Sequence, residues 1–443
     1  MMAETTAETT AKVSLPDNLA WNLLHVLPYY LRGIFTRNPF WTGLIVRYHP
    51  DPNGVRFIQR LRRKYGSDYL YIRMLTTRSL LVLDPAGIQR VLERSPVVYA
   101  DADLKRRGMS HFQPGAVTIS RGRQWQERRR FNEAVLDKGQ RLHGDAWRFN
   151  EIIAQEVAGL DGQRRLHWEE LATLFERITL RVVVGEADTT VTTALKEMMR
   201  EANRVVGLKR SRHFEGFYRK IRTYLAYPPP QSLAARCAQV PAEEDTRVEN
   251  QLPHWLFAMA DTLAVNAARA LALIAAHPRI RQQLAEELAA VDLADPRHLD
   301  GLKILEGCLQ EAMRLWPSVF LLVRKTLTAD ALGGAVVPAG TQVIIHNGFN
   351  HRDGERLDWS DRFQPDFWLE RQGDWRFNHL SNGPQDCAGR ELALFIAKAT
   401  LARLLARGRV ELVGPKLDPN RPLPAAYNHF NLVLALNVES PGG

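Results

Sequence analysis

The chain has 443 residues, of which 45% are hydrophobic and 24% are charged. This balance is typical of a folded enzyme and excludes a disordered, collagen-like or mainly membrane-embedded protein. The formal net charge of +10 at pH 7 would attract an acidic protein partner, but no recognisable nucleic-acid-binding module accompanies it. The three cysteines are too few for a disulfide framework or a four-cysteine zinc site.

The N-terminal segment, residues 1–18, is polar and rich in Thr, and it lacks the basic start and apolar run of a signal peptide. We expect a disordered tail there. The next apolar stretch, 21–35, is interrupted by His25, Pro28 and Arg32, whereas a membrane-spanning helix needs about 20 consecutive apolar residues. The sequence therefore predicts a soluble, cytoplasmic protein with reduced thiols.

The remaining chain, 19–443, is expected to form one domain with a small β region in a mainly helical fold. An amphipathic helix ending at Gly66 leads into a hairpin over 66–85, and a second β region covers 320–348. Helical periodicity dominates 117–320 and returns at 389–407, before two or three terminal strands. The proline-rich and charged residues 227–250 are typical of a connection or a flexible lid.

Cys387 follows a loop with a Gly-Pro pair and immediately precedes a strongly predicted helix. The positive end of a helix dipole and its N–H groups stabilise a thiolate, while Gly383 and Gly389 allow the backbone to approach a flat ligand closely. A metal-bound thiolate fits these requirements. The alternative is that Cys387 is simply a small buried hydrophobic residue.

Two further patterns involve polar groups on predicted helices. Asp261 and Thr262 interrupt an otherwise apolar helix, where an unpaired carboxylate would be costly to bury. The alternative is that both residues face solvent. Trp125 and Arg129 have the i, i+4 spacing that lets an indole N–H and a guanidinium point at one anion.

The last patterns involve charged residues in the second half of the chain. Glu311 and Arg314 share a helical face at ion-pair spacing, which usually indicates only a solvent-exposed pair. Arg324 lies in a predicted strand, and Arg362 lies in a later loop. Each pattern alone is weakly specific, so their order along the chain matters more than any one of them.

Taken together and in this order, the motifs resemble those of the cytochrome P450 family, in particular its soluble bacterial type, from about residue 40 to 435. The family's cysteine signature is matched at four positions: Gly383, Cys387, Gly389 and Ala393. Three positions depart from the family's patterns, because Leu380 replaces Phe, Gln385 replaces Arg or His, and Met259 replaces Gly.

The resemblance implies a mainly α fold with a small β region, a helical triangular prism around one haem b (iron protoporphyrin IX). It makes Cys387 the iron ligand and gives Asp261 and Thr262 the delivery of protons to oxygen. The other residues that it assigns to the cofactor are Trp125, Arg129 and Arg324, beside the propionates, and the glycines Gly383 and Gly389. It also implies that Glu311, Arg314 and Arg362 form a buried network that supports folding and haem retention.

The activity implied is a monooxygenase that receives electrons from NAD(P)H through a ferredoxin reductase and a ferredoxin. It would use O2 to oxidise an apolar small organic substrate, in secondary metabolism. Arg128 and Arg130 are expected on a solvated basic face that could also dock the acidic ferredoxin. We expect a monomer without a nucleic-acid partner, and a substrate pocket lined by apolar residues such as Phe112, Phe214, Tyr218, Val319, Phe320 and Phe430.

Two alternatives stay open. The departures at Met259, Leu380 and Gln385 are compatible with a haem-thiolate enzyme of peroxygenase or rearranging type, although the retained Asp261 and Thr262 argue against it. A non-enzymatic haem-binding or sensor protein would not need that acid and hydroxyl pair, and no signalling domain is apparent in the sequence.

Overall fold

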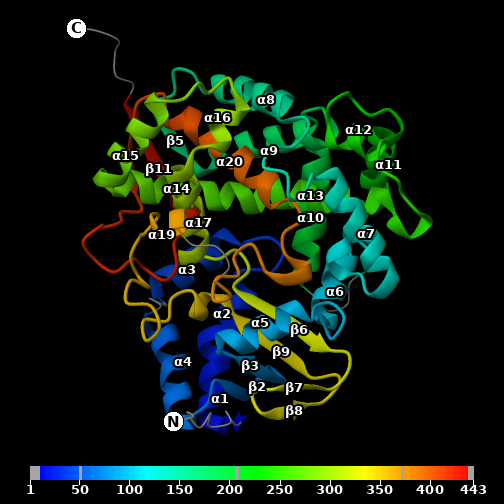
Figure 1. Ribbon diagram of the computed structural model, residues 1–443, viewed down its shortest axis with the longest axis vertical. Helices are drawn as coiled ribbons and strands as arrows, with labels where there is room; N and C mark the ends of the chain where they lie inside the picture. Colours follow the sequence, from blue (N-terminus) through cyan, green and yellow to red (C-terminus); the bar gives the residue numbers. More distant parts are fainter. Residues whose placement is uncertain (1–9, 49–51, 205–208, 371–373, 438–443) are drawn as a thin grey trace.

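The computed structural model describes residues 10–48, 52–204, 209–370 and 374–437. Within these ranges the protein is mainly helical, with a six-stranded, a three-stranded and a two-stranded sheet. Figure 1 shows the largest sheet and the N-terminal helices at one end of the molecule, and most of the later helices at the other. The predicted mainly α fold with a small β region is confirmed.

The described strands are β1 (Ala11–Lys12), β2 (Tyr69–Met74), β3 (Thr77–Val82), β4 (Tyr99–Asp101), β5 (Arg165–His167), β6 (Leu321–Thr326), β7 (Asp330–Leu332), β8 (Ala335–Val337), β9 (Gln342–His346), β10 (Arg409–Gly414) and β11 (Val433–Asn437). The six-stranded sheet has the order β1-β2-β3-β9-β6-β4. Because β3 pairs in parallel with β9, the hairpin near residue 75 and the later β region form one sheet.

The helical segments up to residue 237 are α1 (Leu15–Trp21), η1 (Asn22–Val26), α2 (Leu27–Leu31), α3 (Pro39–Tyr48), α4 (Pro52–Tyr65), α5 (Pro85–Glu93), α6 (Asp103–Ser110), η2 (Val117–Ile119), α7 (Gly122–Val135), α8 (Ala146–Ala158), α9 (Trp168–Val184), α10 (Thr189–Ala202), α11 (Phe214–Ala226) and α12 (Leu233–Cys237). The later ones are η3 (Glu244–Thr246), η4 (Val248–Asn250), α13 (Leu252–Phe257), η5 (Ala258–Leu263), α14 (Ala264–Ala276), α15 (Pro278–Ala289), α16 (Pro296–Asp300), α17 (Lys303–Leu315), α18 (Asn347–Asn350), α19 (Phe367–Glu370), η6 (Gly383–Gln385), α20 (Arg390–Leu405) and η7 (His429–Asn431).

Side-chain alternation along β3 and β9 explains how both faces of the sheet are covered. Leu81 and Ile344 point to the face that packs with residues of α1 and α4. Leu80 and Val343 point to the opposite face and pack with residues of α5. Successive residues of a strand point to opposite faces. A strand that is covered on both faces therefore has a continuous run of apolar residues in its sequence.

The longest apolar helix passes through the main hydrophobic core. Residues 244–276 are long and apolar enough to cross a membrane by length and composition, but 72% of their most apolar window is buried inside the protein. Figure 1 shows α13 and α14 crossing the helical part of the molecule, with α17 and α20 nearby. The middle of this helix, η5, is a π-helical turn.

The N-terminal segment differs from the sequence expectation of a disordered tail up to residue 18. β1 pairs in parallel with β2, Val13 is buried, and α1 begins at Leu15. The Ser14 backbone N–H donates to the Tyr65 hydroxyl at 2.8 Å, and that hydroxyl donates to Asp17 at 2.6 Å. A two-residue strand has too little periodicity to be found in a sequence; residues 1–9 lie outside the described residues.

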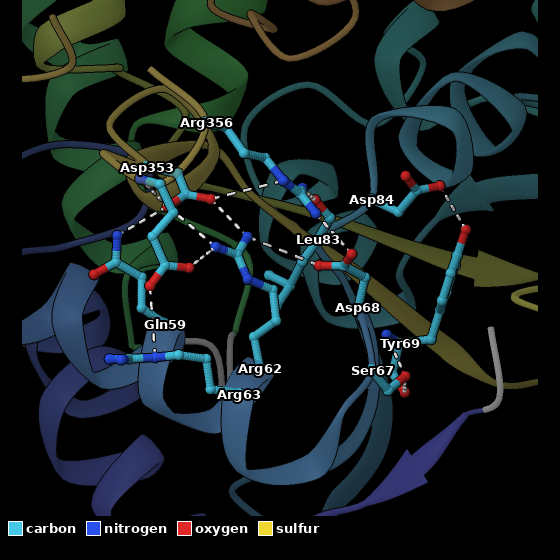
Figure 2. Close-up of polar contacts among 11 residues, drawn as sticks. Gln59, Arg62, Arg63, Ser67, Asp68, Tyr69, Leu83, Asp84, Asp353 and Arg356 are labelled. Carbon is cyan, nitrogen blue, oxygen red and sulfur yellow. Dashed lines mark hydrogen bonds and ion pairs between the residues drawn. The ribbon is translucent and has the colours of Figure 1, made fainter. Parts of the chain in front are cut away.

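A polar network joins the sheet to the segment that leads toward Cys387 (Figure 2). Arg62 of α4 pairs with Asp353 at 2.6 Å, and Gln59 donates to the same carboxylate at 2.8 Å. Arg356 donates to Asp68 at 2.6 Å. The Asp353 side chain is only 2% exposed, so these bonds lie in a poorly solvated environment, where they fix the position of the segment after α18.

Candidate active site

Cys387 lies between η6 and α20, where the sequence predicts a helix start. Its backbone N–H donates to the Leu380 carbonyl at 2.9 Å, which folds the preceding loop back on itself. Neighbouring groups desolvate the thiol strongly, and yet part of the residue remains accessible. Cys387 is thus strongly desolvated without being completely covered by the protein.

The protonation of Cys387 is set by opposing influences. Burial raises the pKa of the thiol above its ordinary value, whereas the Gly389 N–H and the charges of Arg390 and Arg129 act in the opposite direction. The lowered pKa expected from the helix N-terminus is therefore not reached by the polypeptide alone. Coordination to a metal cation deprotonates a thiol outright, so this direction is compatible with a ligand role.

The structure explains the two glycines of the loop differently. Gly383 has φ +71°, and a Cβ there would lie 2.5 Å from the carbonyl oxygen of Leu92, at the end of α5. Gly389 has φ −108°, and the nearest atom to a Cβ there is Leu136 Cδ1, at 3.5 Å. Gly383 is thus required by the protein's own packing, whereas a Cβ at Gly389 would make only an ordinary van der Waals contact.

This difference leads to a paired prediction. Gly383→Ala is expected to lower the free energy of unfolding by about 1–3 kcal/mol through backbone strain alone, with the clash at Leu92 adding to it. Gly389→Ala is expected to change the stability of the polypeptide little but to reduce its haem content. Urea unfolding and the haem-to-protein ratio after reconstitution measure the two effects; wild-type haem binding by Gly389→Ala would contradict the assigned role.

Asp261 and Thr262 lie in η5, which contacts α20. Both are partly accessible within an otherwise buried helix, and the Asp261 carboxyl is strongly desolvated. Burial raises the pKa of the Asp261 carboxyl. The positive charge of Arg37 is the largest influence that acts to lower it. π-Helical turns are frequent at functional sites because the extra residue displaces side chains from the regular helical path.

The three departures from the family pattern have separate surroundings. Met259 is 6% exposed and packs in the main hydrophobic core. Leu380 is half-buried against the same core. The buried amide oxygen of Gln385 has no hydrogen-bond partner among the described residues.

Arg129 of α7 reaches the residue that precedes Cys387. It donates to the Asp386 carbonyl at 2.6 Å and also forms an ion pair with the Asp386 carboxylate, to which Lys138 donates at 2.6 Å. Trp125 lies one turn earlier and is half-buried, with no hydrogen bond from its indole N–H to any described residue. Sequence reasoning missed Asp386 and Lys138, although Asp386 is adjacent to the cysteine.

Arg324 of β6 is paired with a residue that the sequence did not indicate. It lies directly opposite Asp101 of β4 in the sheet, and the two side chains form an ion pair at 2.6 Å, each 4% exposed. Lys105 donates to the same carboxylate at 2.6 Å. The buried Nε of Arg324 has no partner among the described residues, so one donor remains for an acidic ligand.

Replacing Asp101 by Asn is expected to lower stability near neutral pH. Burial acts to raise the pKa of this carboxyl, but Arg324 and Lys105 together hold it below its ordinary value. A lowered carboxyl pKa contributes stability above the ordinary value, and this contribution is lost as the pH falls through the folded-state pKa. In urea unfolding, the difference from wild type should stay constant between about pH 6 and 8 and shrink below about pH 4. An undiminished difference at low pH would contradict this.

The predicted charged network is present, with one correction. Glu311 and Arg314 are fully buried and pair at 2.7 Å. Arg314 also donates to the carbonyl of Arg362, whose own side chain is exposed. The expectation that the Arg362 guanidinium joins the network is wrong, because Trp368 and the backbone N–H of Gln364 take the remaining positions on Glu311.

The apolar residues expected around a substrate are distributed differently. Phe112 and Tyr218 are buried in the main core, where the Tyr218 hydroxyl donates to the Phe112 carbonyl at 3.0 Å. Val319 is 46% exposed. The structure therefore does not bring these residues into one lining.

The site is compatible with a cysteine-ligated haem. Cys387 is partly accessible, the backbone at Gly389 has no side chain beside it, and Arg324 retains an unpaired donor suited to a propionate. The described residues contain no group of three or more His, Cys, Asp or Glu that could hold a metal ion. An acid and hydroxyl pair on the helix that contacts α20 completes a site of the haem-thiolate class.

Comparison with known proteins agrees with this class. Residues 233–427 match the family model described as Cytochrome P450. Pentalenene oxygenase of Streptomyces avermitilis is 30% identical over 207 residues, 45% of this chain and 46% of that protein. Cytochrome P450 4c3 of Drosophila melanogaster is 30% identical over 195 residues, 42% of this chain and 36% of that protein. The matched region thus spans less than half the length of these relatives.

Solved structures extend the likeness to nearly the whole chain. CYP175A1 from Thermus thermophillus superposes with a TM-score of 0.67 at 19% identity, covering 96% of this chain and 99% of that one. A retinoic acid-bound cyanobacterial CYP120A1 gives a TM-score of 0.71 at 15% identity, covering 86% of this chain and 94% of that one. Residues 233–427 are thus similar to the cytochrome P450 family, and the chain has the fold of the solved cytochrome P450 structures. Because its relatives include insect and mammalian proteins, the bacterial type stays a prediction.

Proposed function

We propose that this protein is a haem-thiolate monooxygenase that inserts one oxygen atom of O2 into an apolar organic substrate. The observation that supports this most strongly is the arrangement of Cys387 and the Asp261–Thr262 pair. Cys387 precedes α20, and α20 contacts the π-helical turn that contains the acid and the hydroxyl. The proposed iron ligand and the proposed proton source thus belong to elements that contact each other.

When bound, a haem would supply the activation of O2, which with two electrons and two protons yields one oxidised substrate and one water. Cys387 would bind the iron through sulfur. Trp125, Arg129 and Arg324 would bind the propionates, and the ring would lie against the backbone at Gly389.

Asp261 and Thr262 would supply protons to the reaction. Because burial raises its pKa, Asp261 holds a proton at its carboxyl more readily than an exposed aspartate does. The Thr262 hydroxyl would act as a second hydrogen-bond donor. Such positioned proton transfer typically contributes a factor of about 10²–10⁴ in rate.

The electron source and the substrate are parts of the same proposal. We propose NAD(P)H as the donor, with a ferredoxin reductase and a ferredoxin as carriers, and a cytoplasmic monomer in secondary metabolism. Arg130, 71% exposed on α7, is available to an acidic carrier. An apolar substrate is supported by the name of pentalenene oxygenase and by the retinoic acid in the structure of CYP120A1, since both compounds are largely hydrocarbon.

The carbon monoxide difference spectrum of the dithionite-reduced protein tests the proposal. A strongly red-shifted Soret band is expected for the wild type and for Cys237→Ser, because Cys237 is a buried cysteine of α12 outside the site. The band should be absent from Cys387→Ser. Failure to bind haem, or a histidine-like band in the folded wild type, would overturn the assignment. Substrate oxidation that requires H2O2 and ignores NAD(P)H with carriers would favour the peroxygenase instead.

A further inference from the structure

A second candidate site lies on the flank of the molecule, where α6, η2 and the start of α7 surround a pocket of about 360 Å³. Its wall contains four arginines, Arg106, Arg107, Arg121 and Arg128, but only one carboxylate, that of Asp103. Asp103 is shared between Lys325, at 2.5 Å, and Arg121 of the pocket, at 3.5 Å. The pocket therefore has a strong excess of positive charge.

The arginines of this pocket repel one another. The pKa of Arg106 is lowered by burial and then by the nearby charge of Arg121. Burial also lowers the pKa of Arg128, followed by the charge of Arg247. Asp103 at Arg106 and Asp245 at Arg128 offset this charge in part, and an anion bound among the arginines would add a further favourable interaction.

Arg128 is the deepest of these groups and differs from its sequence expectation. Instead of lying on a solvated face, it is 4% exposed. Its guanidinium donates to the Ser120 hydroxyl at 2.6 Å and to the Asp245 carbonyl at 2.8 Å, and it forms no ion pair with any described residue. A buried cation with only neutral acceptors is unusual, because buried charges are normally paired.

Further donors are available at the mouth of the pocket. α7 begins at Gly122, directly after Arg121; its N-cap position has no side-chain cap, and its first turn contains no acidic residue. The buried Nε of Arg121 has no hydrogen-bond partner among the described residues. The N-terminus of a helix presents free N–H groups and a positive dipole end, which together favour an anion.

The pocket is separate from the residues assigned to haem. Residues three, four and seven apart share a face of a helix, so Arg121, Gln124 and Arg128 lie along one face of α7. Trp125 and Arg129 lie along the neighbouring face, and Arg129 contacts the residue before Cys387. The second site is thus on the same helix but turned away from the Cys387 loop.

We propose that this pocket binds a small phosphate-type oxyanion, either free phosphate or the phosphate group of a metabolite, among Arg106, Arg121 and Arg128. The concave shape and the depth of Arg128 favour a small ligand, because an acidic side chain on a partner's surface reaches only the rim. The site goes beyond the proposed monooxygenase function and does not depend on it.

Calorimetric titration of the full-length protein tests the site, with inorganic phosphate or phenyl phosphate added at constant ionic strength. Saturable binding of either is expected, and its affinity should fall at least tenfold in Arg121→Gln and in Arg106→Gln. Arg130→Gln is the matched control, since this arginine lies on the opposite face of α7 and is 71% exposed; it should bind as wild type does. Preference for phenyl phosphate would identify a metabolite ester as the ligand, and preference for phosphate the free ion.

Several outcomes would overturn the proposal. They are the absence of binding beyond that of chloride, an equal loss in the Arg130→Gln control, and binding only to vesicles of anionic lipid or to an acidic protein. Far-ultraviolet circular dichroism verifies that each variant is folded. Cys387→Ser should retain saturable phosphate binding that the Arg121→Gln change weakens, so failure of the haem assignment and failure of this site are distinguishable.

Discussion

Replacing Glu311 by Gln is expected to lower the free energy of unfolding by about 3–5 kcal/mol. Glu311 and Arg314 are fully buried, and both oxygens of Glu311 accept from Arg314 at 2.7 Å. The remaining positions on the carboxylate are taken by the Gln364 N–H and the Trp368 indole N–H, each at 2.9 Å. An amide would leave the Arg314 charge uncompensated and would direct its own N–H groups at other donors.

The chain contains a matched control for this experiment. Glu197 and Arg200 have the same three-residue spacing on α10, but their side chains are 40% and 61% exposed. Glu197→Gln should change the stability by no more than about 0.5 kcal/mol, because exposed pairs contribute little. Urea unfolding followed by circular dichroism compares the two variants. Equal effects would show that burial of the Glu311 pair has no energetic consequence.

The second large effect is expected for Arg129→Gln, which should accelerate haem loss at least tenfold. Arg129 is 9% exposed and binds both the carbonyl and the carboxylate of Asp386, next to Cys387. Hydrogen bonds to charged groups contribute about 1.5–3 kcal/mol, and a tenfold change in rate or equilibrium corresponds to about 1.4 kcal/mol. Without this link, only Lys138 holds the Asp386 side chain.

The rate of haem transfer to excess apomyoglobin measures this effect without any substrate. Arg130→Gln, at the next position of the same helix, is the control and should release haem as wild type does. Asp386→Asn should accelerate the loss as well, and less than additively with Arg129→Gln, since both changes remove one contact. Slow release from Arg129→Gln would contradict a role of this arginine in holding the cysteine loop.

Local patterns predicted the fold class, the start of the helix after Cys387 and the apolar helix around Asp261, because these depend on periodicity within one segment. Partners from distant segments were not predictable. Asp101 meets Arg324 only because β4 and β6 are neighbours in the sheet, and Trp368 displaces the Arg362 side chain from Glu311 through the path of a loop. The spacing of Arg128 could not distinguish a solvated face from a buried one.

The placement of Gly383 shows a related limit. From sequence, both loop glycines could serve the approach of a flat ligand. Only the structure shows that Gly383 is needed because a side chain there would clash with the carbonyl of Leu92. The assignments of Cys387, Asp261 and Thr262 to chemistry stay predictions that the spectra and variants above would test.

α7 presents Arg129 to the cysteine loop and Arg128 to the flanking pocket, from adjacent positions on the same helix. If an anion bound in the pocket shifts this helix, the fit on the other side changes as well, and the two sites are then thermodynamically linked. Linkage is reciprocal: the factor by which a filled pocket alters haem affinity is the factor by which haem alters the affinity for the anion. Phosphate concentration would then belong among the variables that set how firmly this protein retains its haem.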